Sequence, residues 1–66
     1  MKTANEILNV LEVKEVLVKS DNYLQIVDVN NNFREFQKDY RKQLWYEFKT
    51  IGNSENPTEI FINFVN

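Results

Sequence analysis

Residues 32–52 hold the strongest pattern in this chain, and they predict one long amphipathic helix. Asn32 suits the N-cap because its side chain can accept hydrogen bonds from first-turn amides, and Glu35 completes a capping-box spacing. Gly52 stands where helices commonly end in a left-handed residue. At about 100° per residue, the large apolar residues fall on one face, which we expect to pack on the core. They are Phe33, Phe36, Tyr40, Leu44, Phe48 and Ile51.

The flank beside this face carries the basic residues of the predicted helix and is the first candidate contact surface. Its six residues are Arg34, Lys38, Arg41, Lys42, Trp45 and Lys49. Trp and Arg are enriched at binding hot spots, which favours contact with an acidic protein partner or with a second copy of the chain. The alternative is that Trp45 covers the edge of the core, with the stems of Arg41 and Lys49 packed along its ring.

The first half of the chain predicts a short helix followed by a hairpin. Thr3 and Glu6 form a second capping box before apolar residues at helical spacing, so residues 4–11 are expected to be helical. Residues 16–18 and 23–29 are mostly apolar and flank a polar three-residue turn, which predicts two antiparallel strands. That turn would place four of their apolar residues on one face. They are Val16, Val18, Leu24 and Ile26.

The order of elements predicts an α+β fold in a single domain, residues 1–66. After a polar loop, residues 58–65 are expected to form the last strand. Placing this strand beside the first one makes every neighbouring pair antiparallel. The predicted order is therefore α-β-β-α-β. In this fold a three-stranded antiparallel sheet, order 2-1-3, packs against the long helix and the short N-terminal helix.

The length of the chain limits the size of its core. A domain of 66 residues buries only about 60% of the surface that its unfolded chain exposes, and small domains often add disulfides, a metal or a second subunit. The sequence has no cysteine and no histidine, so disulfides are excluded and a metal site is not expected. A homodimer, or dense packing of the aromatic residues, is expected to supply the missing stability.

The residue types also argue against an enzyme. No histidine is present to act as a base, Ser20 and Ser54 lie in predicted turns, and a single glycine cannot form a Gly-rich phosphate loop. The segment 28–39 begins with the oxygen spacing of a calcium-binding loop, but Phe33 occupies the position that needs glycine. We therefore expect no catalysis, no small-molecule substrate, no cofactor and no metal.

The hydropathy pattern predicts a cytoplasmic protein without membrane contact. The longest uninterrupted apolar runs have three residues, far below the ~20 needed to cross a bilayer. Near the N-terminus, Lys2 is followed by the polar residues Asn5, Glu6 and Asn9, which interrupt any secretory signal.

These observations predict a non-enzymatic protein-interaction module that binds and occupies the surface of a larger partner. Abundant Asn, Ile and Lys with a single Ala and Gly is typical of AT-rich coding DNA, which favours an inhibitor or accessory factor encoded by a phage or mobile element. The alternative is a nucleic-acid-binding module that uses the basic and aromatic helix flank. The sequence pI near 5.0 counts against this alternative, because most nucleic-acid modules are basic overall.

Overall fold

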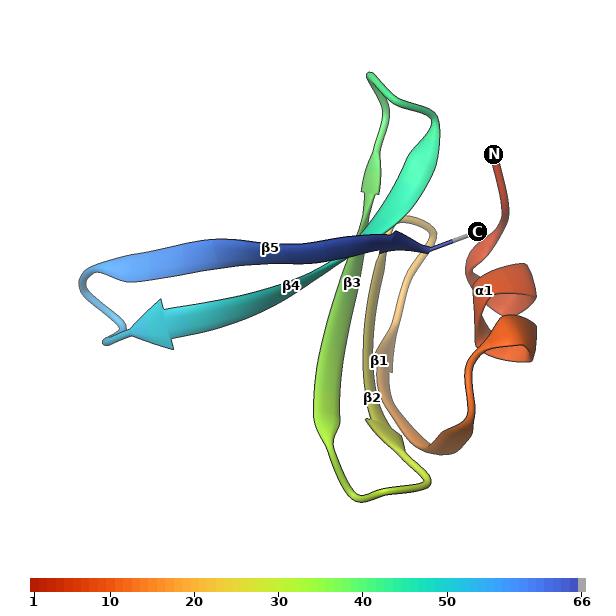
Figure 1. Ribbon diagram of the computed structural model, residues 1–66, viewed down its shortest axis with the longest axis horizontal. Coiled ribbons are helices and arrows are strands. Elements are labelled where there is room, and N and C mark those ends of the chain that lie inside the picture. Colours follow the sequence, from red (N-terminus) through yellow and green to blue (C-terminus); the bar gives the residue numbers. More distant parts are fainter. Residues whose placement is uncertain (66) are drawn as a thin grey trace.

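The computed structural model describes residues 1–65, which form one short helix followed by five strands. The elements are α1 (Ala4–Val10), β1 (Val13–Lys19), β2 (Tyr23–Asp28), β3 (Phe33–Asp39), β4 (Leu44–Gly52) and β5 (Pro57–Val65). The strands make one antiparallel sheet in the order β1-β2-β3-β4-β5, so each strand pairs with the next one along the chain (Figure 1).

The prediction of a long helix is wrong, and with it the predicted three-stranded sheet. Residues 33–52 form the β3–β4 hairpin, in which Glu35 lies opposite Phe48 and Asp39 opposite Leu44. The strand order 2-1-3 is also wrong, because β1 lies at an edge of the sheet and β5 pairs with β4. The domain is mostly β, with one short helix.

A turn in the middle of the expected helix explains this outcome. The Asp39 carboxylate oxygen Oδ1 accepts hydrogen bonds from the backbone N–H groups of Arg41 (3.0 Å) and Lys42 (3.3 Å), and Gln43 has a left-handed φ of 56°. Such local side-chain bonds compete with the helical ones. The residues that follow, Trp45 to Ile51, are mostly aromatic or β-branched, which suits a strand.

The two residues expected to cap the long helix also serve turns. The Asp28 carboxylate accepts hydrogen bonds from the N–H groups of Asn30 (2.9 Å) and Asn32 (3.0 Å), which closes the β2–β3 turn. Gly52 has φ +91°, and a Cβ there would lie 2.5 Å from the Asn56 carbonyl oxygen. Gly52 therefore begins the β4–β5 turn rather than ending a helix.

Three smaller predictions are confirmed. The helix α1 starts with the capping box, in which the Thr3 hydroxyl accepts from the Glu6 N–H and the Glu6 carboxylate accepts from the Thr3 N–H, although it ends one residue before Leu11. The β1–β2 hairpin and the last strand are also present. The predicted face is wrong for Val18, because a register shift after Val16 places Val18 opposite Gln25.

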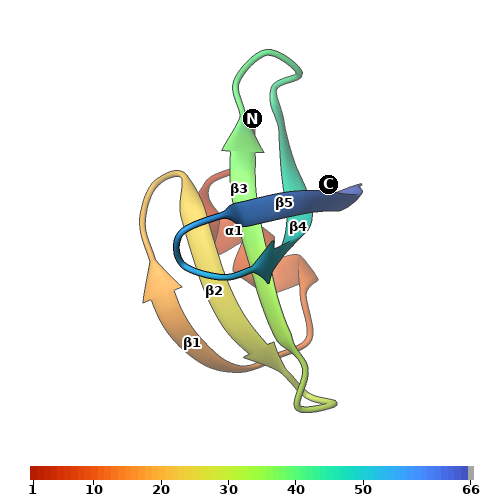
Figure 2. The same cartoon turned by 90° about the vertical axis from the view of Figure 1, so that its left-hand side faces the viewer.

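One side of the sheet is covered by α1, and we call it the helix side (Figure 2). The core lies there and consists of Ala4, Ile7, Leu24, Ile26, Phe36 and Trp45. We call the opposite side the open side, because no second layer of the described residues lies over it. β4 bends away from β3 toward the open side, and its last part pairs only with β5 (Figure 1). We call this projecting hairpin, residues 49–62, the arm.

Candidate interaction surface

The structure separates the six residues predicted to form one basic flank. Side chains alternate along a strand, and the strand register places Arg34, Lys38, Trp45 and Lys49 on the helix side. The other two, Arg41 and Lys42, lie in the exposed β3–β4 turn. The predicted contact surface depended on the long helix and is not formed.

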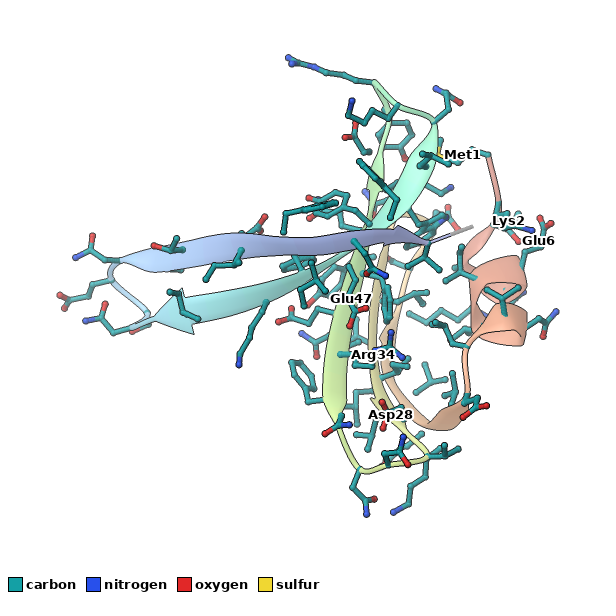
Figure 3. The ribbon with its side chains drawn as sticks, viewed as in Figure 1. Met1, Lys2, Glu6, Asp28, Arg34 and Glu47 are labelled. Atoms are coloured by element: carbon teal, nitrogen blue, oxygen red, sulfur yellow. The ribbon has the colours of Figure 1, made fainter. Side chains whose placement is uncertain are left out.

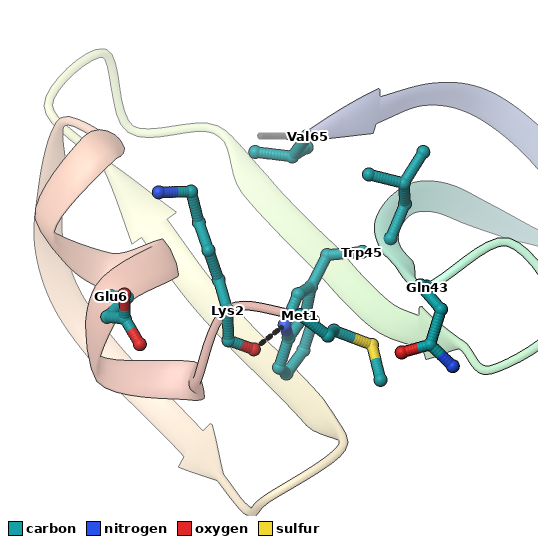
Figure 4. A pocket seen from close by; sticks show the side chains of 7 residues that line it. Met1, Lys2, Glu6, Gln43, Trp45 and Val65 are labelled. Carbon is teal, nitrogen blue, oxygen red and sulfur yellow. Dashed lines mark hydrogen bonds between the residues drawn. The ribbon is translucent and has the colours of Figure 1, made fainter.

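Trp45 belongs to the core. Its indole is 1% exposed, and its Nε1 donates a hydrogen bond to the Lys2 carbonyl oxygen at 2.8 Å (Figure 4). The Lys38 ammonium lies 5.5 Å from the centre of the ring, where a cation is favoured. Of the two interpretations of Trp45, packing inside the protein is therefore correct. The N-terminal segment before α1 is held to the sheet by this residue.

Arg34 joins two carboxylates on the helix side (Figure 3). Its guanidinium donates two hydrogen bonds to Glu47, both at 2.8 Å, and lies 3.9 Å from Asp28. Both acidic residues are buried, so they need this partner. The guanidinium pairs with Glu47, and the Asp28 carboxylate also accepts backbone N–H groups of the β2–β3 turn. We assign it a structural role at the junction of three strands.

The stability of the β2–β3 turn should depend on pH through Asp28. Hydrogen bonds from the Asn32 and Asn30 N–H groups, helped by Arg34, lower the pKa of the Asp28 carboxyl below its usual 3.8. A lowered pKa adds stability that is present above the unfolded-state pKa and is lost as the pH falls through the folded-state value. We expect the thermal midpoint to fall below pH ~4, and to fall less in Asp28→Asn, which retains an acceptor oxygen.

The matched control for this measurement is Asp21→Asn, which changes an exposed aspartate in the β1–β2 turn. Its acid profile should follow that of the unmodified protein. If Asp28→Asn shows the same acid sensitivity as the unmodified protein, then another carboxylate controls it.

The open side carries a chain of aromatic rings among its polar residues, in which Phe61 and Phe64 are exposed, Tyr23 and Tyr46 are half-buried and Phe48 is buried. Its members are Tyr23, Tyr46, Phe48, Phe61 and Phe64. Successive ring centres are 5.0 to 6.4 Å apart, within the range of favourable aromatic pairs. The rings come from β2, β4 and β5, so they connect the sheet to the base of the arm. We call them the aromatic cluster.

The charges beside the aromatic cluster are of both signs. The register of β2 to β5 places Glu35, Asp39 and Glu59 on the open side. The bend of β4 brings Lys49 into the angle between β3 and the arm, and the Lys42 ammonium lies beside the Phe64 ring. Burial raises the pKa of the Tyr46 hydroxyl, and Glu59 and Asp39 raise it further. Burial and the hydrogen bond to Glu35 likewise raise the pKa of Tyr23. The aromatic cluster therefore lies between acidic and basic side chains, and not beside a uniformly basic flank.

Two hollows lie on either side of the arm. One of about 290 Å³, in the angle between β3 and the arm, has Phe33, Phe48 and Ile62 among its walls. The other, of about 370 Å³, is lined in part by Tyr40, Tyr46, Phe61 and Phe64 and reaches the β3–β4 turn. A further hollow of about 330 Å³ lies over Trp45 beside the N-terminal segment (Figure 4). The hollow between β3 and the arm exposes more apolar surface than the other two.

The arm exposes large apolar residues far from the core. They are Ile51, Ile60, Phe61 and Ile62. According to the strand register Ile51 and Ile60 share one face of the arm, whereas Phe61 lies on the other with the aromatic cluster. A stretch of sequence could have signalled this surface: residues 60–65 contain no charge, no glycine and no proline. The predicted final strand included them, but they were not expected to contact a partner.

No known protein guides the assignment of function, since the chain matches no family model, no curated protein and no solved structure. Within residues 1–65, no cluster of three side chains could hold a metal ion. The helix α1 has 7 residues, and the described part of the chain contains no helix suited to spanning a bilayer. The candidate site therefore depends on the geometry of the open side and the arm.

Proposed function

We propose that the protein is a non-enzymatic protein-interaction module that binds a larger partner through its open side. The observation that carries this proposal is the aromatic cluster on a sheet side without a covering layer. Domains usually bury the apolar side of a sheet under a second layer, and aromatic residues are enriched at the centres of protein interfaces. A partner that fills the angle between the sheet and the arm would supply that layer.

The charges of the open side suggest the chemistry of this partner. Glu35, Asp39 and Glu59 lie on the open side, so a partner with an apolar centre and basic residues opposite these three carboxylates would be complementary. This replaces the acidic partner expected from the sequence, because the basic residues of that prediction lie on the helix side or in a turn. A phage or mobile-element origin stays a prediction from composition alone.

The test compares two exposed apolar residues on opposite sides of the molecule. Phe33 is 55% exposed on the open side, and Val10 is 51% exposed on α1. Tagged protein carrying Phe33→Ser should capture about tenfold less of a partner protein from host lysate, the effect of losing a hot-spot residue of ~1.4 kcal/mol, whereas Val10→Ser should capture the normal amount. Quantitative mass spectrometry of the captured proteins provides the measurement.

Equal capture by both variants would contradict the proposal, provided that their thermal midpoints match that of the unmodified protein.

The alternative of nucleic-acid binding is supported by the β3–β4 turn, where the Lys42 ammonium lies 6.0 Å from the Phe64 ring centre. Under that alternative nuclease treatment should abolish the capture, and binding to an oligonucleotide should weaken steeply between ~50 and ~200 mM salt.

A further inference from the structure

We infer that the free edge of β5 pairs with β5 of a second copy of this chain to form an antiparallel homodimer. The contact is centred on the outer backbone edge of β5 and shares Phe61 and Phe64 with the aromatic cluster. Phe33 belongs to the proposed partner contact alone, so a substitution there can separate the two proposals. The sequence suggested a dimer from the small size of the core and from the basic flank, and the edge of β5 gives a different location for the contact.

The two edges of the sheet differ in their protection against pairing. In β1, three of seven residues are charged, namely Lys14, Glu15 and Lys19, and the register shifts twice. In β5, Glu59 is the single charged residue among nine, and the register shifts once. Charged residues and bulges are the usual means by which proteins keep an edge strand from pairing with another chain. The edge of β5 has fewer of them, namely Glu59, the bulge at Ile62 and Pro57 at its start.

The side chains of β5 supply apolar area for such a contact. Ile60, Phe61, Ile62 and Phe64 are 37 to 54% exposed. At roughly 200 Å² for a large side chain, half exposed, they present about 400 Å² per copy, about half of the ~800 Å² that each partner buries in a standard interface. Cross-strand contacts with the second copy would bury part of this area on both faces of the arm.

A further strand beside β5 would stabilise the arm. From Lys49 to Gly52, β4 has β5 as its one neighbour, because its pairing with β3 ends at Phe48. An isolated two-stranded hairpin is at best marginally stable in water, whereas three or more strands can be stable. Pairing β5 with its copy would join the two arms into a four-stranded sheet in the order β4-β5-β5-β4.

The sequence of β5 is compatible with its own copy. In an antiparallel pair related by a two-fold axis through the sheet, the central residue lies opposite itself. If Phe61 is central, Glu59 lies opposite Asn63 of the copy, and no like charges meet. Pairing of β5 with β1 of another copy would instead be head-to-tail and give open chains. The charges and bulges of β1 oppose that arrangement.

Matched lysine substitutions on the two edges test this inference. Sedimentation of the full chain from ~1 µM to ~1 mM should show a dimer that dissociates on dilution. Ile62→Lys on β5 should raise the dissociation constant of the dimer at least ~100-fold, because pairing would remove the new lysine ammonium from water. Leu17→Lys on β1 should change this constant less than ~3-fold. A monomer at ~1 mM, or equal weakening by Leu17→Lys, would overturn the inference.

Cysteine substitutions provide a second test that does not depend on the lysine variants folding. The chain has no native cysteine, so one introduced residue can pair only with its copy. Oxidation should give a disulfide-linked dimer for at least one of Ile60→Cys, Phe61→Cys and Ile62→Cys, since Cα atoms near the axis lie within bridging distance. Leu17→Cys should not react, and the reverse result would place the dimer at β1 and overturn the inference.

Phe33→Ser should leave the dissociation constant of the dimer unchanged, because Phe33 lies on β3, away from the β5 edge. Loss of partner capture in that variant with the dimer retained is the result expected when both proposals are correct. A monomeric protein that still loses capture through Phe33→Ser would overturn the dimer alone.

Discussion

Trp45→Ala is expected to remove a large part of the protein's stability at 25 °C. Truncating a buried tryptophan costs about 3–5 kcal/mol, and a domain of this length has roughly 3–10 kcal/mol in total. Trp45 also fastens the segment before α1 through its hydrogen bond to Lys2. The loss should therefore include both core packing and docking of the helix. Urea unfolding followed by circular dichroism gives the change in the free energy of unfolding.

The control for this prediction is Trp45→Phe, which retains a ring but removes the indole donor. It should cost less, about 1–3 kcal/mol from the smaller ring and the unpaired Lys2 carbonyl. Trp45 is the single tryptophan, so intrinsic fluorescence of the unmodified protein reports directly on this position. A folded Trp45→Ala protein with an unchanged unfolding midpoint would show that the indole is not part of the core.

Phe36→Ala and Phe33→Ala should have very different effects on stability, although the two residues are three positions apart. Phe36 is fully buried between α1 and the sheet, whereas Phe33 lies exposed on the open side. We expect a loss of about 3–5 kcal/mol for Phe36→Ala and less than ~1 kcal/mol for Phe33→Ala. Chemical denaturation of the two variants under identical conditions measures the difference.

This pair also distinguishes the hairpin from a helix. On a helix, residues three apart lie on the same face, so both phenylalanines would be core residues and both substitutions would be costly. On a strand, an odd spacing places them on opposite sides. Similar large losses for both variants would contradict the hairpin in residues 33–52.

Short-range signals in the sequence were sufficient to predict α1. The Thr3 hydroxyl and the Glu6 carboxylate lie within one turn, and their reciprocal hydrogen bonds need no help from the rest of the protein. The polar turn after Lys19 and the mostly apolar residues on both sides of it likewise specified the first hairpin locally. These elements were predicted correctly because the residues that determine them are near each other in sequence.

The spacing of apolar residues in the second half of the chain was ambiguous. Phe33, Phe36, Leu44 and Phe48 fit a helical period, but they also fit two strands that have apolar residues on both sides. Asn32 and Gly52 suit helix caps and hairpin turns equally well. The Asp39 turn was the local signal that could have decided between them, since its carboxylate binds two following N–H groups.

The six basic and aromatic residues were grouped on one flank for the same reason. A helical rotation of ~100° per residue groups Trp45 with the basic residues on an exposed flank. The strand alternation turns Arg34, Lys38 and Trp45 toward α1 instead, where Arg34 is neutralised by Glu47. On the expected helix, Glu35 and Asp39 would lie on the side away from the basic flank. On β3 they lie on the open side, next to the aromatic cluster.

The sequence alone determined where the chain turns and which residues are apolar, because turn chemistry and side-chain polarity act over a few positions. Tertiary structure decided which apolar residues are covered. Phe36 and Phe61 are the same residue type in strands of the same sheet, but α1 buries one and the bend of β4 carries the other away from the core. Burial depends on contacts between residues distant in sequence, and periodicity within one segment contains no information about them.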